Sequence, residues 1–472
     1  MKLLGLDVGT STICGLLLDA GDGSIPFLQT ESNTAGIPAR EPWESLQDPD
    51  AAVRIARQII DKALSLHPDV RGIGIASQMH GILYTDGKGN AVSPLYTWQD
   101  GRGDLPFREG SYASCVSAAL GRPAATGMGA VTHFANVKMR LVPKSAACLC
   151  TIGDYLAMKL GGRTAPVTDV SNAAGMGGFE LEKLAFDVSG LSGLGLDPAF
   201  FPEVTGTYPA IGELKGTAAA GSPAKLSAPK RGIPVFPAVG DNQASFLGSI
   251  ADKDHMALVM VGTGSQISVF VPSYRWIKGL DLRPLPFGGY IGVGAGLCGG
   301  RAYAALREFF RRTVLTVTGE DREIPWDVMN DMSMEAAADA LRVDTRFSGT
   351  RASPEARGSI TNLGLGNFTP QHLASGVREG IVAELLGFYK LLDKTERDRV
   401  RMLVGSGNAI RLGAPLQRAF QEGFGVPLRV PRHREETAFG AALIAGVASG
   451  SIPDLAAAGS LVRYQDAPDS QA

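Results

Sequence analysis

The sequence has little net charge, few cysteines and no long apolar segment, and each of these absences excludes a class of protein. Its 45 lysines and arginines nearly balance 47 acidic residues, so the basic surface of a nucleic-acid-binding protein is missing. No apolar run approaches the ~20 residues that a membrane span needs, and the N-terminus has no signal-peptide pattern. Five cysteines, an odd number, are typical of reduced thiols in a cytoplasmic protein. We therefore expect a globular cytoplasmic protein with no nucleic-acid partner and no membrane partner.

The length and the patterning indicate an α/β protein with two large domains. A chain of 472 residues exceeds one typical hydrophobic core. Segments with strand and helix patterns alternate, which favours an α/β architecture. The spacing of apolar residues predicts a helix over 52–64, and "RGIGIAS" (71–77) predicts a buried strand. We further expect helices at 300–316, 376–393 and 412–423, a strand at 402–404, a loop or sheet edge at 205–232, and a frayed tail after 465.

Two similar hairpins are expected about half a chain apart. The segment "MKLLGLDVGTSTICGLLLD" (1–19) has an apolar run, a polar turn and a second apolar run, and "ALVMVGTGSQISVFV" (257–271) repeats this order. When Gly9-Thr10 is placed over Gly262-Thr263, the flanking runs align, and Met260 takes the position of Asp7. The match favours two related lobes that face each other across a cleft, over a chance recurrence of Gly-Thr.

The turn of the first hairpin, from Asp7 to Thr12, suits a phosphate group. Glycine lets the backbone approach closely, and the amides and hydroxyls that follow can donate to anionic oxygens. Asp7 beside such a turn can hold Mg²⁺ through water, because magnesium loses its hydration shell reluctantly. The alternative is an ordinary hairpin whose aspartate caps its own turn. The recurrence of the pattern in "VGTGSQ" (261–266) favours phosphate binding.

A further acid follows a strand-like run in "FPAVGDNQASFLGS" (236–249). The run ends at Gly240, and Asp241 comes next, before a segment compatible with a helix. A carboxylate at a strand end can accept the proton of a hydroxyl that attacks a phosphoryl group. Alternatively, Asp241 or Asn242 caps the helix that follows. Both roles are compatible if Asn242 caps and Asp241 faces the substrate.

The motifs "SQMHG" and "TWQDGR" have the composition of a sugar site. Gln78, Met79 and His80 directly follow an expected buried strand, and ligands of α/β sheets gather at the carboxyl ends of strands. Trp98 and Arg102 add an apolar face and a planar group that donates hydrogen bonds. The alternatives are a semi-buried histidine and a plain Asp-Gly turn.

Other nucleotide-binding motifs are absent or weak. No G-x-x-x-x-G-K-[ST] occurs, which excludes a P-loop enzyme. A G-x-G-x-x-G match at Gly294, Gly296 and Gly299 lies far from a first βα turn, and Asp321 follows it in a polar, turn-like segment. NAD binding is therefore a poor alternative.

Five segments, taken in order, resemble the FGGY carbohydrate kinases, which are two-lobed members of the actin-like, ribonuclease H-like ATPase superfamily. They are "GLDVGTSTICGLLLD", "SQMHG", "PAVGDNQASFLGS", "VMVGTGSQIS" and the segment from "LVGSGNAIRLG" to "ETAFGAALIAG", and they span roughly 3–450. The resemblance implies an α/β fold with two ribonuclease H-like domains flanking a central cleft. It implies a sugar-binding N-terminal lobe (1–240), a nucleotide-binding C-terminal lobe (241–450) and a tail (451–472).

The resemblance and the turn chemistry together imply a set of site residues and ligands. Asp241 would be the general base, and Asp7 would lie near Mg²⁺. The residues expected to contact the sugar are Gln78, Met79, His80, Trp98, Arg102 and Asn242. The residues expected to contact ATP are Thr10, Ser11, Thr12, Thr263, Gly264, Gly300, Gly405, Gly407 and Asn408.

The implied reaction is transfer of the γ-phosphoryl group of ATP to a primary hydroxyl of a ketose. Within the family, "TWQDGR", "DVSNAAGMGGFEL" and "GSGNAIR" followed by "HREETAFGAAL" are most similar to sedoheptulokinases, which implies sedoheptulose as the acceptor. A xylulokinase or another pentulose or polyol kinase of the family is the alternative. A more distant alternative is an actin- or Hsp70-like ATPase, although we expect no room for a peptide-binding domain after residue 450. A non-catalytic sugar sensor is disfavoured because both acids are present, and homodimer formation is left open.

Overall fold

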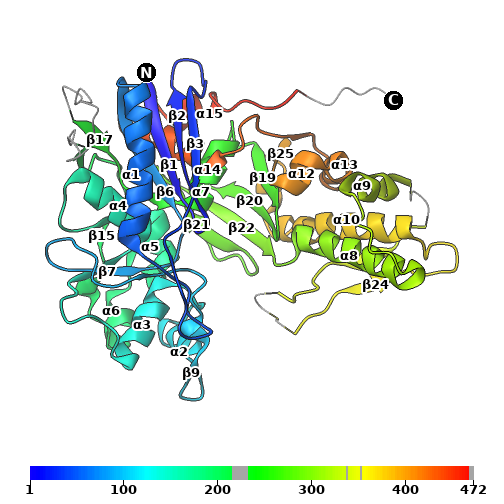
Figure 1. The fold of residues 1–472 in the computed structure, drawn as a ribbon, viewed down its shortest axis with the longest axis horizontal. Coiled ribbons are helices and arrows are strands. Elements are labelled where there is room, and N and C mark those ends of the chain that lie inside the picture. The colour runs from blue at the N-terminus through cyan, green and yellow to red at the C-terminus, as the bar shows by residue number, and fades with distance from the viewer. Residues whose placement is uncertain (215–231, 336–338, 351–352, 354, 467–472) are drawn as a thin grey trace.

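The fold has two lobes, each built on a β-sheet with helices packed on it (Figure 1). The computed structural model describes residues 1–214, 232–335, 339–350, 353 and 355–466. The expected α/β class with two lobes is confirmed. Most of the segment expected as a loop or edge, and the end of the tail, lie outside the described residues. In the part that is described, no helix is both long enough and apolar enough to cross a membrane.

The two sheets have the same strand order around their hairpins. The first sheet runs, in order, through β16 (Gly212–Leu214), β17 (Ile233–Val235), β6 (Val70–Ser77), β1 (Lys2–Val8), β2 (Thr12–Asp19) and β3 (Phe27–Ser32), and β18 (Val239–Gly240) also pairs with β6. The second runs through β21 (Asp281–Pro284), β22 (Tyr290–Gly296), β20 (Ser265–Val271), β19 (Met256–Val261), β25 (Met402–Ser406) and β26 (Leu428–Arg429). In each sheet an antiparallel hairpin is followed by a strand parallel to its first arm. This shared order confirms the two expected hairpins and supports the duplication.

Helices cover the two sheets. The first lobe has α1 (Pro49–Leu66), α4 (Ile152–Gly161) and α5 (Val170–Met176), and a second small core around α2 (Tyr112–Leu120), α3 (Gly129–Met139) and α6 (Val188–Gly193). The second lobe has α8 (Gly299–Thr318), α9 (Trp326–Glu335), α10 (Pro370–Tyr389), α12 (Asn408–Leu412) and α13 (Ala414–Phe424). The helices expected at 52–64, 300–316 and 376–393 are present as α1, α8 and α10, with α10 beginning six residues early. The helix expected at 412–423 is α13, which begins at Ala414 because Gly413 separates it from the short helix α12.

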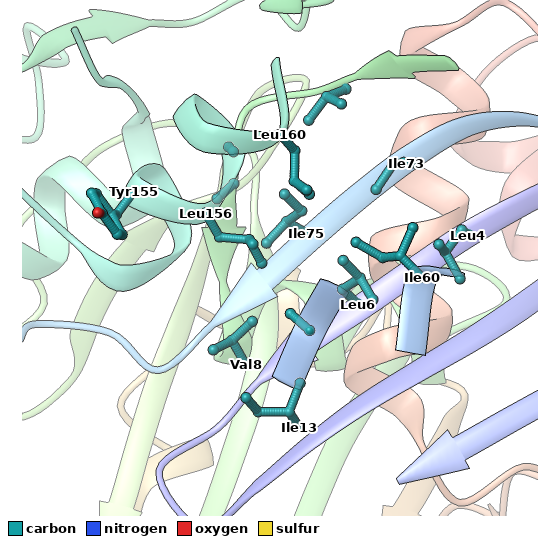
Figure 2. Close-up of a cluster of buried hydrophobic side chains, with 14 of the residues drawn as sticks. Leu4, Leu6, Val8, Ile13, Ile60, Ile73, Ile75, Tyr155, Leu156 and Leu160 are labelled. Atoms are coloured by element: carbon teal, nitrogen blue, oxygen red, sulfur yellow. The ribbon is translucent and has the colours of Figure 1, made fainter. Parts of the chain in front are cut away.

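Strand β1 is apolar from Leu3 to Leu6 and again at Val8, because both of its faces are covered. On one face, Leu4, Leu6 and Val8 pack with Ile60 of α1 in a buried cluster, which Figure 2 shows together with side chains of α4. On the other face, Leu3 packs against α14 (Glu436–Ala448), a helix near the C-terminus. Burial of each such side chain contributes about 1.5–3 kcal/mol.

The two lobes are joined by α7 (Asp241–Ser249) and α14, which pack on each other and on the first sheet. The approach is too close for side chains at four glycines, which are Gly5, Gly74, Gly248 and Gly440. A Cβ atom at Gly5 of β1 would lie 1.9 Å from the Ala438 carbonyl oxygen, and one at Gly74 of β6 would lie 2.0 Å from that of Ala441. The crossing of α14 and α7 brings Gly440 equally close to the Ala244 oxygen, where a Cβ would lie 1.9 Å away. Helix α14 therefore contacts the first sheet by backbone as well as by side chain.

We predict that Gly440→Ala lowers the free energy of unfolding by about 1–3 kcal/mol, because the added methyl overpacks the α7–α14 crossing. Gly387→Ala in α10 is the matched control, since nothing lies within 4 Å of a Cβ at that position. It replaces a helical glycine in open space and should leave stability unchanged or raise it by up to about 1 kcal/mol. Urea unfolding of both variants measures the effect, and equal midpoints would contradict the close approach.

Candidate active site

Three parallel strands of the first sheet end at one edge and bring the expected catalytic residues together. Strand β1 pairs with β6 up to Val8 and Ser77, and β18 pairs with β6 through Gly240 and Ser77. Asp7, the "SQMHG" motif and Asp241 therefore all lie at the carboxyl edge of this sheet. This edge is where polar groups of α/β sheets meet their ligands.

Helix α5 fixes the backbone that leads into Asp241. The Gly240 N–H donates to Ser171 Oγ at 2.8 Å, and this hydroxyl donates to Asp169 Oδ1 at 2.6 Å. The amide of Asn172 donates to the Ala238 carbonyl at 3.0 Å. The segment that resembles sedoheptulokinases, 169–181, thus supplies the support of the expected base.

Neither Asp241 nor Asn242 caps α7, so the capping alternative is wrong. The residue at the N-cap position is Gly240, and no side chain accepts from the first turn as a cap would. Asp241 is the first helical residue, and its Oδ1 accepts only the N–H of Asn242, at 2.7 Å. The Oδ1 atom of Asn242 is buried and has no hydrogen-bond partner among the described residues. Both side chains keep polar atoms available for a ligand.

Two carboxylates at this edge have raised pKa values. Burial raises the pKa of Asp7 to about 8, and the charges of Asp241 and Glu435 act in the same direction. Burial also raises the pKa of Asp241 to about 6, against the opposing effects of the Asn242 N–H and the Arg283 charge. Crowded carboxylates with raised pKa values mark a place where a cation or a proton transfer fits.

The residues present fit a magnesium ion bound together with nucleotide phosphates. Asp7 Oδ1 is buried and has no hydrogen-bond partner within the described residues. In the same part of the chain, no three acidic, histidine or cysteine side chains form a cluster that could hold a metal. Mg²⁺ is usually held by one or two carboxylates plus phosphate oxygens and water, so a single aspartate at this position suffices.

The first hairpin is hydrogen-bonded to the expected sugar segment. The Thr10 hydroxyl donates to Gln78 Oε1 at 3.0 Å, and the Trp98 indole N–H donates to the same hydroxyl at 2.9 Å. The side-chain amide of Gln47 links them further, since it donates to the Thr10 carbonyl and accepts from Gln78. The structure thus brings Thr10, Gln78 and Trp98 together, while Ser11 and Thr12 are exposed in the turn.

Met79 packs against the backbone that leads into Asp241, and His80 is bonded to the backbone of α5. A Cβ at Gly240 would lie 2.7 Å from Met79 Sδ, so the Met79 side chain packs directly against this glycine. His80 has a φ of 74°, which side chains rarely adopt, and its Nδ1 lies 2.6 Å from the Gly175 carbonyl oxygen. A strained backbone held by its surroundings is typical of functional sites.

Arg102 lies in a buried network instead of at the open edge. It is 2% exposed, and its guanidinium is ion-paired with Asp100 and bonded to Asn136. The guanidinium also stacks 4.1 Å above the ring of Tyr96. Because its donors are engaged, Arg102 supports the loop that carries Trp98, and direct contact with a sugar would require this network to break.

A cavity of about 830 Å³ in the second lobe contains part of the expected nucleotide site. Thr263, Gly300 and Asn408 line it, from the second hairpin, the start of α8 and the start of α12. The cavity is also lined by residues that sequence reasoning missed: Arg301, Tyr303, Trp326, Asp327, Asn330, Arg378, Ala409, Leu412 and Gly413. Arg301 and Tyr303 follow Gly300 within one helical turn, a spacing that could have indicated them. Trp326 opens a separate helix, and no pattern linked it to the hairpins.

The other expected nucleotide glycines allow close backbone packing around this cavity. Gly407 has a φ of 86°, and a Cβ there would lie 2.5 Å from the Val261 carbonyl oxygen. A Cβ at Gly405 would meet Ile410 at 2.6 Å, and one at Gly264 would meet the Gly296 oxygen at 2.8 Å. None of the three lines the cavity: Gly264 lies in the second hairpin turn, Gly405 in β25 and Gly407 at the N-cap position of α12.

Two glycines of the G-x-G-x-x-G match allow close packing of β22 against α10. A Cβ at Gly294 would lie 2.3 Å from Phe388, and one at Gly296 would lie 2.4 Å from Glu384. Asp321 is ion-paired with Arg311 on the surface. These contacts give no support to the dinucleotide alternative.

The comparisons with known proteins agree with this geometry. Residues 2–248 match the N-terminal domain, and residues 259–449 the C-terminal domain, of the FGGY family of carbohydrate kinases. The chain belongs to this family, and it is therefore a carbohydrate kinase, a phosphotransferase that uses ATP.

Individual relatives differ in the acceptors that their names state. A sedoheptulokinase of Mus musculus is 28% identical, over 93% of this chain and 96% of the relative. A glycerol kinase of Delftia acidovorans is 25% identical, over 95% of this chain and 90% of the relative. A solved xylulose kinase from Rhodospirillum rubrum has a TM-score of 0.82 at 20% identity, over 99% of this chain and 93% of that one, which shows the shared fold.

We predict that Gly300→Val weakens ATP binding at least about tenfold, since a Cβ at this position would lie 2.4 Å from the Gly262 oxygen and displace the second hairpin. Calorimetric titration with a non-hydrolysable ATP analogue measures the change. Gly319→Val, beyond the far end of α8, serves only as a folding control because its φ of 76° adds strain without touching the cavity. Unchanged affinity in Gly300→Val would contradict this location for the nucleotide.

Proposed function

We propose that the protein transfers the γ-phosphoryl group of ATP to a primary hydroxyl of sedoheptulose, giving sedoheptulose 7-phosphate. The observation that carries the proposal is the meeting of Asp241 with Gln78 and Met79 at one strand edge. The 28% identity to a sedoheptulokinase over nearly the whole chain supports the choice of sugar. We place the reaction in the cytoplasm.

In this proposal, Asp241 accepts the proton of the reacting hydroxyl. A general base works best when its pKa lies near the working pH, and burial brings the pKa of Asp241 to about 6. The sugar oxygen then attacks the γ-phosphorus, and the bond to the β,γ-bridging oxygen breaks as ADP leaves. The buried, unpartnered Oδ1 of Asn242 would accept a hydrogen bond from another hydroxyl of the sugar.

The two hairpins would hold the phosphates in different ways. The Thr263 side of the second hairpin lines the cavity and can reach the nucleotide directly. The Thr10 hydroxyl is already bonded to Gln78 and Trp98, so the first hairpin would offer its turn amides and the exposed Ser11 and Thr12. This bonding would also couple the sugar segment to the phosphate turn. Asp7 would hold Mg²⁺ through water, and the ion neutralises phosphate charge when bound.

A pentulose or polyol acceptor is the alternative, since the matched relatives include glycerol kinases. Purified protein with Mg·ATP should release ADP fastest with sedoheptulose when it is compared with xylulose, ribulose and glycerol. If another acceptor gives faster turnover, that acceptor is the substrate and the assignment of sedoheptulose is wrong. ADP release that no acceptor stimulates contradicts a sugar kinase of this acceptor range and favours an ATPase with a protein partner.

We predict that Asp241→Asn lowers kcat by about 10²–10⁴-fold, because the amide cannot accept the proton. Asp254→Asn is the matched control, an exposed aspartate in the connector after α7 that should leave kcat unchanged. Coupled measurement of ADP release gives both values. A kcat for Asp241→Asn equal to that of the control would rule out the base.

The pH dependence follows from the direction of the Asp241 shift. The base must be ionised, so kcat/KM should fall about tenfold per pH unit below a pKa of about 6 and level off above it. A pH–rate profile of the wild-type protein from pH 5 to 8 tests this. A limb centred near pH 4 would show that Asp241 has the pKa of an ordinary exposed aspartate.

A further inference from the structure

The basic residue Arg283 lies on a strand of the second lobe and faces the first. In an antiparallel pair, directly opposite residues point to the same face of the sheet. Arg283 of β21 is opposite Ile291 of β22, and Ile291 packs with Ala244 and Phe246 of α7 and with Val239 of the first sheet. The side chain of Arg283 therefore points toward α7, the helix that begins at Asp241.

Two contacts fix β21 beside Asp241. The side-chain amide of Gln243, two residues after Asp241, donates to the Pro284 carbonyl at 3.2 Å. The ring of Phe287, just beyond β21, lies 4.6 Å from that of Tyr208, and the Tyr208 hydroxyl donates to Asp169. Asp169 in turn holds Ser171, which accepts the Gly240 N–H. The strand that carries Arg283 is thus connected to the backbone before Asp241 and to the side chain two residues after it.

The guanidinium of Arg283 has donors to spare. Its side chain is only 13% exposed, and its Nε donates to Asp281 Oδ2 at 2.8 Å. In the part of the chain that the structure describes, neither Nη atom has a hydrogen-bond partner. The positive charge of Arg283 lowers the pKa of Asp241, which indicates that the two side chains are near each other. These Nη groups are therefore available to donate to an anionic ligand.

The turns of the two hairpins have no basic side chain that could neutralise a bound phosphoryl group. The turns 9–12 and 262–265 contain no lysine or arginine, while the acids Asp7 and Asp241 lie at the same edge. A phosphoryl group in transfer spreads negative charge over its oxygens, and preorganised donors aimed at that charge lower the barrier. The planar fork of arginine matches such oxygens in pairs.

We propose that Arg283 is a catalytic residue whose Nη groups donate to the phosphoryl oxygens while the group passes from ATP to the acceptor oxygen beside Asp241. The acceptor in this statement rests on the proposed function, and the role toward the phosphoryl group does not. The acceptor O–H bond breaks and its proton goes to Asp241. An O–P bond forms to the acceptor, and the bond from phosphorus to the bridging oxygen breaks, leaving its electron pair on ADP. Arg283 keeps its protons throughout.

The test replaces Arg283 and separates chemistry from binding. Arg283→Met should lower kcat by about 10²–10³-fold, as loss of one transition-state donor does, with KM for ATP and sugar changed less than about threefold. Arg283→Lys should recover part of this loss, because lysine keeps the charge and lacks the paired donors. Arg275→Met is the matched control, an arginine of the same lobe that pairs with Asp393 and Glu396, and it should leave kcat unchanged.

Chemical rescue distinguishes a contact in the transition state from a structural role. Guanidinium ions at millimolar concentration should restore activity to Arg283→Ala and should not affect the Arg275 control. If Arg283→Met unfolds early in a thermal scan, the partial activity of Arg283→Lys and the rescue decide the question. Activity of Arg283→Met within about threefold of wild type, or a loss confined to the KM of the sugar, overturns the proposal.

The same variants are assayed for ATP hydrolysis without sugar. Water is then the acceptor, and Arg283→Met should lower this rate by a similar factor, because the phosphoryl charge is the same. If the wild type hydrolyses ATP without stimulation by any sugar, the proposed function fails while the role of Arg283 is still tested. If sugars stimulate the wild type but neither rate depends on Arg283, the proposed function stands and the role of Arg283 fails.

Discussion

The contact of α14 with the first sheet is the constraint on which the rest of the structure depends. Glycines at Gly5 and Gly74 let the helix backbone lie against β1 and β6, and the same helix crosses α7 at Gly440. Because α7 begins with Asp241, the packing of α14 on α7 also fixes the position of the expected base. The carboxyl edge of the first sheet and the expected base therefore have fixed relative positions. Helix α5 adds the hydrogen bonds that hold the backbone before Asp241.

Burial and charge then act on the site in opposite directions. Removal of Asp7 and Asp241 from water favours their neutral forms, and the charge of Asp241 further disfavours ionisation of Asp7. The charge of Arg283 on the second lobe opposes this effect at Asp241 and favours its ionised form. The ionisation of the expected base therefore depends on a residue of the other lobe.

The sequence indicated the parts of the fold that depend on local pattern. The apolar runs of β1 and β19 and their Gly-Thr turns identified the hairpins, and their recurrence indicated the two lobes. The strand end before Asp241 identified the candidate base. The network that buries Arg102 could not be predicted, because it depends on Asn136, which is 34 residues away in sequence. Arg283 and Trp326 were missed for the same reason, since only tertiary packing brings β21 to α7 and α9 to the second hairpin.

The packing of α14 also decides how the chain can be divided. A cut in the connector between α7 and β19 would separate the two family domains, yet it would remove α14 from the half that contains β1 and β2. Leu3, Leu16 and Leu18 would then lose the side chains of Phe439 and Leu443 that bury them. An isolated N-terminal half would expose this apolar face to water, and large exposed apolar patches promote association. The halves are therefore expected to require co-expression, with the second half completing the core of the first.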